Sequence, residues 1–186
     1  MSKQFPTIAC CGLDCGLCPR YHALEASRCP GCAGPDFTIK HPSCGVVTCC
    51  VKKRNLEVCA QCDEFPCAKF DNRLDAPGDS FLTYQKLAQN MSYIRDHGLN
   101  AFLEQQSQRI SILEQFLLEF DDGRSKTFFC LATTLLPIPA LEGAVDETMN
   151  IVKDKGLDNR KEKTKILRNI LEREAEKEKV VLKLRK

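Results

Sequence analysis

The chain has 186 residues and a net charge of +2, with 28% charged and 43% hydrophobic residues. These values are typical of a folded globular protein and exclude a wholly disordered chain. The longest apolar runs, such as residues 127–139, are shorter than the roughly 20 residues that cross a bilayer, and the first ten residues contain no apolar signal-peptide core. We therefore expect a folded cytoplasmic protein without a membrane segment.

Cysteine is the residue type that departs most from average usage. There are 13 cysteines, of which twelve lie between Cys10 and Cys67, with Cys130 alone in the remainder. An oxidising compartment would favour a disulfide scaffold, but the missing secretion signal and the odd count favour metal ligation. Charge is also uneven, at +6 for residues 151–186 and −4 for residues 1–150. Interleaved acids in the basic segment favour a solvated amphipathic helix over an anion-binding surface.

Residues 10–67 show little hydrophobic periodicity and are interrupted by Gly, Pro and Cys. This pattern is typical of a segment whose backbone is fixed by metal closure and not by an apolar core. Only short helices are expected here, over residues 19–26 and 46–54 and from near Pro66, because proline is tolerated at the first helical position.

After a predicted turn at residues 76–79, the pattern becomes helical. One stripe, closed by Gly98, contains Phe81, Tyr84, Leu87, Ala88, Met91 and Ile94. Further helices are predicted over residues 102–120, 125–136, 141–155 and 159–177, and residues 180–184 alternate weakly enough to allow a short strand. The expected fold is mainly α, with a cysteine-rich module of short helices and loops over residues 1–75 and a mainly helical domain over residues 76–186.

The cysteines fall into pairs with the spacing of metal ligands. The C-x-x-C pairs are Cys15/Cys18, Cys29/Cys32 and Cys59/Cys62, and the C-x-x-x-x-C pairs are Cys44/Cys49 and Cys62/Cys67. Two thiolates separated by two residues can point into one tight turn, whose amides donate to the sulfurs. The segment Cys29-Pro30-Gly31-Cys32-Ala33-Gly34 looks like a zinc knuckle. Tetrahedral zinc takes four ligands, so ten thiolates fill two sites, and the remaining two join a third site with a histidine or stay free.

A second metal chemistry is consistent with the first cysteines. Cys11, Cys15 and Cys18 have the C-x-x-x-C-x-x-C spacing that supplies three ligands to an iron–sulfur cluster. They resemble the triplet of radical S-adenosylmethionine enzymes, but only over these eight residues, and no α/β barrel pattern follows. Spacing alone does not separate zinc from iron. The knuckle favours zinc.

Three motifs together resemble a family of small prokaryotic cysteine-rich proteins known only as a domain of unknown function. They are Cys11-Gly12-Leu13-Asp14-Cys15, Cys29-Pro30-Gly31-Cys32 and Cys59-Ala60-Gln61-Cys62-Asp63-Glu64-Phe65-Pro66-Cys67. The likeness extends to residues 122–126, 129–132 and 182–186. It implies metal binding in a bacterial or archaeal cytoplasm, with no established reaction. The implied metal ligands are Cys11, Cys15, Cys18, Cys29, Cys32, Cys44, Cys49, Cys59, Cys62 and Cys67. Cys10 and Cys50 fall outside the pattern, so we interpret them as spare thiols.

Histidines are weaker candidates than the cysteines. His41 could complete a mixed site, and His22, which follows Cys18, could serve in the same way. His97 precedes Gly98, which predicts a place at a helix C-terminus. Cys67 could be a reactive nucleophile at a helix start, but its cysteine neighbours favour a ligand.

Three functions remain open at this point, and whether the protein is an enzyme is not decided. The leading hypothesis is a structural-zinc interaction or adaptor module, with two or more zinc ions and a protein partner, because no nucleotide loop or catalytic triad is visible. The alternative is an iron–sulfur or thiol-based redox protein. Nucleic-acid binding ranks third, because Trp is absent and only three Tyr are present to stack on bases.

Overall fold

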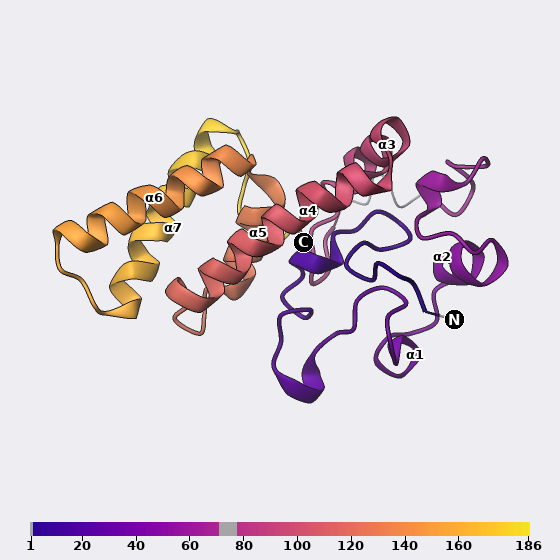
Figure 1. The fold of residues 1–186 in the computed structure, drawn as a ribbon, viewed down its shortest axis with the longest axis horizontal. Coiled ribbons are helices and arrows are strands. Elements are labelled where there is room, and N and C mark those ends of the chain that lie inside the picture. Colours follow the sequence, from indigo (N-terminus) through magenta and orange to yellow (C-terminus); the bar gives the residue numbers. More distant parts are fainter. Residues whose placement is uncertain (1, 71–77) are drawn as a thin grey trace. The chain divides into compact units, whose positions relative to one another are not determined.

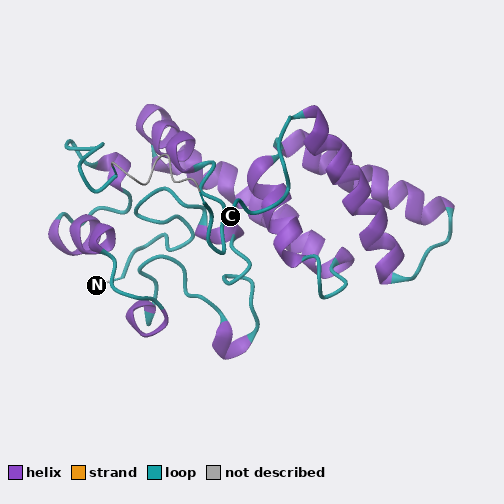
Figure 2. Ribbon diagram, turned by 180° about the vertical axis from the view of Figure 1, so that it is seen from behind, coloured by secondary structure: helices purple, strands orange, loops and turns teal. Residues whose placement is uncertain are grey.

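The computed structural model describes residues 2–70 and 78–186. Within these residues the secondary structure is helical, and no strand is present (Figures 1 and 2). The helices are α1 (Phe37–Lys40), α2 (Gly45–Val47), α3 (Leu87–His97), α4 (Leu99–Gln115), α5 (Lys126–Leu135), α6 (Ile138–Asp154) and α7 (Arg160–Lys177). The mainly α fold class is therefore confirmed.

The chain forms two compact units. The first contains Met1–Gln106 and Leu184–Lys186, and the second contains Ser107–Lys183. The second unit is thus inserted between two segments of the first. The division predicted between residues 75 and 76 lies outside the described residues and stays a prediction.

Loops dominate the cysteine-rich part of the first unit (Figure 2). Its regular elements are α1, α2 with a π-helical turn at Thr48–Lys53, and three single 3₁₀ turns at Cys15–Leu17, Glu25–Ser27 and Cys59–Gln61. Its core combines apolar side chains with the thiols of Cys10, Cys32 and Cys50. Because thiols occupy core positions, the cysteines of this unit contribute to its packing as well as to its chemistry.

Two glycines allow close approach in the first unit. Gly12 has φ +88°, and a Cβ there would lie 2.6 Å from the Cγ of Met91 on α3. Gly31, in the predicted knuckle, has φ +82°, and a Cβ there would lie 2.4 Å from the carbonyl oxygen of Pro6. Both positions therefore require glycine, because a side chain would meet a neighbour and positive φ strains other residues.

The second unit is a set of packed helices. Its core includes Phe116 and Phe129, whose ring centroids lie 5.4 Å apart. Arg109 donates from Nη1 to the carbonyl oxygens of Thr133 and Leu136, at 2.6 and 2.7 Å, at the end of α5. Helices α6 and α7 lie side by side (Figures 1 and 2).

The helices predicted after residue 80 are confirmed, with some shifts at their starts. The predicted helix over residues 159–177 is α7, and Asn159 caps it by accepting a hydrogen bond from the Lys161 amide at 2.9 Å. The stripe predicted from Phe81 is wrong at its start, because α3 begins only at Leu87 and Phe81 is 59% exposed. Leu87, Met91 and Ile94 are buried as predicted, whereas Ala88 is exposed.

The break between α5 and α6 is shorter than the two prolines predict. The sequence predicts that Pro137 and Pro139 both interrupt the helices, yet Pro139 lies in the first turn of α6. Proline is tolerated there because the first amides of a helix have no intrahelical acceptor.

Three further expectations need correction or restriction. The helix over residues 19–26 does not form, and turns with a single 3₁₀ turn at Glu25–Ser27 take its place. Residues 66–70 are not helical and form a turn in which the Phe70 amide donates to the Cys67 carbonyl at 2.8 Å, whereas the continuation of the helix predicted from near Pro66 lies outside the described residues. Residues 180–184 form no strand, since no strand among the described residues could pair with them.

None of the helices among the described residues is long and apolar enough to cross a membrane.

Candidate metal centre

Two of the C-x-x-C motifs adopt the same local backbone. In one, the amide of Cys18 donates to the carbonyl of Cys15 at 3.2 Å, and in the other the amide of Cys62 donates to that of Cys59 at 3.0 Å. Each motif is therefore a single 3₁₀ turn. This compact backbone is the tight turn that the spacing predicts for paired thiolates.

The knuckle motif is built differently. The amide of Cys32 donates to the carbonyl of Pro6 at 2.9 Å, and the amide of Cys29 donates to that of Arg20 at 2.8 Å. Both cysteines of the motif are buried. The segments on either side of the first C-x-x-C motif therefore hold the knuckle in place.

Asp14 ties the first motif to α4. Its side chain is buried and accepts a hydrogen bond from Nε2 of Gln106, which also donates to the carbonyl of Thr7 at 3.0 Å. The backbone carbonyl of Asp14 accepts from the Leu17 amide at 3.0 Å, inside the 3₁₀ turn. This network fixes the turn that carries Cys15 and Cys18.

The first cysteine group consists of Cys11, Cys15, Cys18, Cys29 and Cys32. Burial raises the pKa of the Cys15 thiol well above its ordinary value, and the charges of the other four thiols raise it further. Burial also raises the pKa of Cys18, although the amides of Arg20 and Tyr21 donate to its sulfur and oppose the shift. Amide donors of this kind stabilise a metal-bound thiolate.

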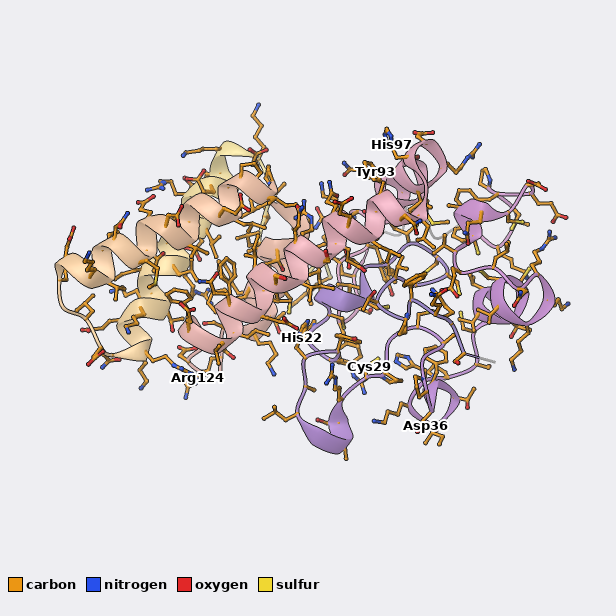
Figure 3. All side chains as sticks on the ribbon, in the orientation of Figure 1. His22, Cys29, Asp36, Tyr93, His97 and Arg124 are labelled. Atoms are coloured by element: carbon orange, nitrogen blue, oxygen red, sulfur yellow. The ribbon has the colours of Figure 1, made fainter. Side chains whose placement is uncertain are left out.

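His41 lies beside this group. Its Nε2 is 3.1 Å from Sγ of Cys29, whose position Figure 3 marks. The imidazole ring stacks on Phe37 at a centroid distance of 4.6 Å, which fixes its orientation. Burial, with the nearby charge of Arg20, lowers the pKa of His41 and so favours the neutral ring that binds metals.

The other two histidines make different contacts. Nε2 of His22 lies 2.7 Å from the carbonyl oxygen of Gly16, a backbone contact inside the first cysteine group's turn. His97 is the last residue of α3, as predicted, and its ring packs on Tyr93 at 4.5 Å (Figure 3).

The second cysteine group lines one pocket. Its members are Cys49, Cys50, Cys59, Cys62 and Cys67. The side chain of Arg54 also lines this pocket, where it pairs with Glu64 at 2.5 Å and hydrogen-bonds Cys49. The hydrogen bond with Glu64, followed by that with Cys49, raises the pKa of the Arg54 guanidinium. A permanent cation therefore lies beside these thiols.

A row of contacts connects the two groups through the supposed spare thiols. Sγ of Cys10 lies 3.9 Å from Sγ of Cys32, in the first group. Cys10 also contacts Cys50, which contacts Cys59 in the second group. We call Cys32, Cys10, Cys50 and Cys59 the thiol row.

Burial and mutual contacts keep the thiols of Cys10, Cys32 and Cys50 protonated in the absence of a cation. The hydrogen bond with Cys32 lowers the pKa of Cys10, but the contact with Cys50 and burial outweigh it and raise this pKa to about 12. The balance at Cys50 is the same. The hydrogen bond with Cys10 lowers the pKa of Cys50, but the contact with Cys59 and burial outweigh it and raise this pKa to about 12. The contact with Cys10, followed by burial, raises the pKa of Cys32.

All 13 cysteines are thiols, none joined in a disulfide. Nine of the ten predicted ligands lie in the two groups, and the tenth, Cys44, is half-buried directly before α2. Cys130 is buried in α5. Among the described residues, no three His, Cys, Asp or Glu side chains are placed to hold one metal ion. The chemistry of the donors fits a thiophilic metal, and the ligand set stays a prediction.

The family comparison agrees with the sequence resemblance. Residues 7–72 match the family described as Protein of unknown function (DUF3795). This DUF3795 segment contains all ten predicted ligands and both cysteine groups, but not the expected likeness at residues 122–126, 129–132 and 182–186. Searches of curated proteins and of solved structures found no match.

Sequence patterns did not indicate two features of the centre. Cys10 and Cys50 each form a Cys-Cys doublet with a predicted ligand, and this doublet pattern is the signal that could have revealed them. Lys3, whose charge lowers the pKa values of Cys10, Cys32 and Cys50, precedes the DUF3795 segment, and no local pattern indicates it.

Proposed function

We propose that residues 10–67 bind metal through cysteine thiolates, that the metal is zinc, and that it stabilises an interaction or adaptor module in a reducing, cytoplasmic compartment. The observation that carries the proposal is the grouping of thiols. Four gather around Cys15, and five line one pocket with Arg54. Thiols at this density, without disulfides, are typical of metal ligation.

Electrostatics supports a cation in these groups. Burial and neighbouring thiols raise the pKa values of Cys10, Cys15, Cys18, Cys32 and Cys50. A bound divalent cation would reverse this preference, since it replaces the protons and stabilises thiolates. Binding would therefore release protons and stabilise a unit that is rich in loops.

Zinc is favoured over other metals by the donor set. The knuckle has small residues around Cys29 and Cys32, and Cys18 receives backbone amide hydrogen bonds. His41 lies beside Cys29 and could supply a nitrogen ligand to a mixed site. Structural zinc sites use such cysteine and cysteine–histidine sets and hold the fold of small modules.

Elemental analysis of the anaerobically purified full chain tests this proposal. We expect about two zinc ions per chain, in line with four thiolates per ion, and unfolding of the first unit when a strong chelator is added. Far-ultraviolet circular dichroism and hydrogen exchange would follow the two units. Protein that lacks stoichiometric metal, and keeps its fold with the chelator, would overturn the proposal.

An iron–sulfur centre is the second candidate, supported by one observation. Cys11, Cys15 and Cys18 have cluster spacing, and the charges of Cys11 and Cys18 act on Cys15. Protein containing such a cluster would be brown and carry iron and acid-labile sulfide in equal amounts. A colourless preparation that contains zinc and no sulfide would exclude this candidate.

A further inference from the structure

Lys3 is buried, which is unusual for its residue type. Its relative exposure is 6%, whereas lysine is almost never fully buried unless it is paired. Its backbone amide donates to the carbonyl of Ala33, inside the knuckle, at 3.0 Å, and Nζ donates to the carbonyl of Ile8. Both contacts hold the ammonium group inside the first unit.

The charge of this ammonium reaches thiols. It acts on Cys10, Cys32 and Cys50, three members of the thiol row. Within residues 2–70 and 78–186, no carboxylate forms an ion pair with Lys3. A buried charge without a counter-charge is costly, so this site favours an anionic neighbour.

The distance between Cys10 and Cys32 suits a shared metal. Four thiolates at about 2.3 Å from a tetrahedral zinc lie about 3.8 Å from one another. Sγ of Cys10 and Sγ of Cys32 lie 3.9 Å apart, and both residues are buried. The backbone amide of Cys10 also donates to the Cys32 sulfur, a contact that supports a bound thiolate.

A metal–thiolate centre would supply the missing negative charge. Zinc with four thiolates has a net charge of −2, so a buried ammonium beside it lowers the cost of excluding water. Arg54 occupies the corresponding place beside the second cysteine group, but it is exposed and pairs with Glu64. Lys3 is thus a buried cation whose charge acts on the thiol row.

We propose that Cys10 is a metal ligand together with Cys32, and that Lys3 is the counter-charge that stabilises this metal–thiolate centre. The inference rests on the proposed metal binding and adds two residues to it. Cys10 lies outside the ligand positions that the sequence resemblance implies, and Lys3 lies before the matched segment. Lys3 is a positioning and charge-balancing residue, and Cys10 binds the metal directly.

The role of Lys3 is tested by zinc affinity, measured by competition with a chromophoric chelator. The proteins are the metal-free full chain and its Lys3→Met, Lys3→Arg and Lys52→Met variants. Lys52 is an exposed lysine on the turn after α2 and serves as the matched control. We expect Lys3→Met to bind zinc about 10–100-fold more weakly, the usual effect of removing a supporting partner of a metal ligand. Lys3→Arg, which keeps the charge, and Lys52→Met should bind like the wild type.

The role of Cys10 is tested with cobalt, whose thiolate charge-transfer absorption grows with each bound thiolate. We expect Cys10→Ser to lose the contribution of one thiolate, and Cys130→Ser to lose none. The spectrum is recorded on cobalt-bound protein that carries the native Lys3, so this test of Cys10 does not depend on whether a Lys3 variant folds. An unchanged spectrum for Cys10→Ser would overturn the ligand assignment.

The outcomes separate this inference from the proposed function. If the wild type binds no metal, both fail. If the wild type binds zinc and Lys3→Met binds it equally well, only the role of Lys3 fails. If Lys3→Arg binds zinc as weakly as Lys3→Met, the loss comes from packing and not from charge, which would also overturn its role.

Discussion

Asp79 and Arg185 are joined by four hydrogen bonds although 106 residues separate them in the chain. The Asp79 carboxylate accepts from Arg185 N at 2.8 Å, Nη2 at 2.8 Å and Nε at 3.2 Å. The Asp79 amide donates to the Arg185 carbonyl at 3.1 Å. Asp79 also accepts from the Tyr84 amide at 2.9 Å. The segment before α3 and the returning segment 184–186 are thereby locked within the first unit.

Replacing Asp79 should destabilise the first unit. Asp79→Asn removes the charge and at least one acceptor from a side chain shielded from solvent, and we expect a loss of about 1–3 kcal/mol in the free energy of unfolding. Urea unfolding followed by circular dichroism measures it. The control is Glu147→Gln, the same change on an exposed carboxylate paired with Arg173 in the second unit, which should have a smaller effect. Equal losses would contradict this account.

The contribution of Asp79 should depend on pH. Burial opposes ionisation, but the hydrogen bonds from Arg185 and the Tyr84 amide outweigh it and lower the pKa of the carboxyl. The stabilisation is therefore full above the unfolded-state pKa of about 4 and is lost as the pH falls through the lower folded-state value. The difference in unfolding free energy between wild type and Asp79→Asn should shrink between pH 7 and pH 3. A constant difference would be inconsistent with this pKa shift.

Loss of a knuckle cysteine should unfold one unit selectively. Cys29→Ser or Cys32→Ser removes a proposed metal ligand, so residues 10–67 should lose most of their amide protection from hydrogen exchange. The protection of α5, α6 and α7 should persist. Cys130→Ser changes a buried thiol of the second unit and should leave residues 10–67 protected. Protection of residues 10–67 in both kinds of variant would argue against metal-dependent folding.

Two glycine substitutions should have opposite signs. Gly31→Ala places a Cβ 2.4 Å from the Pro6 carbonyl at φ +82°, and strain of this kind costs of the order of 1–3 kcal/mol or more. Gly143 lies exposed in α6, and a Cβ added there would have no neighbouring atom within 4 Å, so Gly143→Ala should stabilise by about 0.5–1 kcal/mol. Thermal unfolding of both variants checks the pair. A tolerated Gly31→Ala would mean that the knuckle backbone can shift.

Periodicity and end signals predict the helical part well. The α7 helix follows from its stripe of Leu167, Ile170 and Leu171, which are buried, and it begins after Asn159, where the predicted range starts. The short elements of the first unit are harder to predict, because hydrogen bonds between distant residues decide them. The turn that replaces the helix expected over residues 19–26, for example, is fixed by the Cys29 amide bonding to Arg20.

In the candidate metal centre, too, some features could be predicted from local sequence and others could not. Residue type and spacing identify the cysteines as candidate metal ligands, and the ten predicted ligands all lie in the DUF3795 segment. Spacing could not show that Cys10 meets Cys32 or that the charge of Lys3 acts on the thiol row, because these residues lie on separate loops. Groupings of ligands that depend on long-range contacts are not encoded in local sequence patterns.

The insertion of the second unit constrains the order of events during synthesis. The chain leaves the first unit after Gln106 and returns to it at Leu184. A ribosome must therefore complete the whole helical insert before Arg185 can reach Asp79. Nascent chains would carry twelve thiols in an unfinished unit throughout that interval, when oxidants and competing metals have their best access to them.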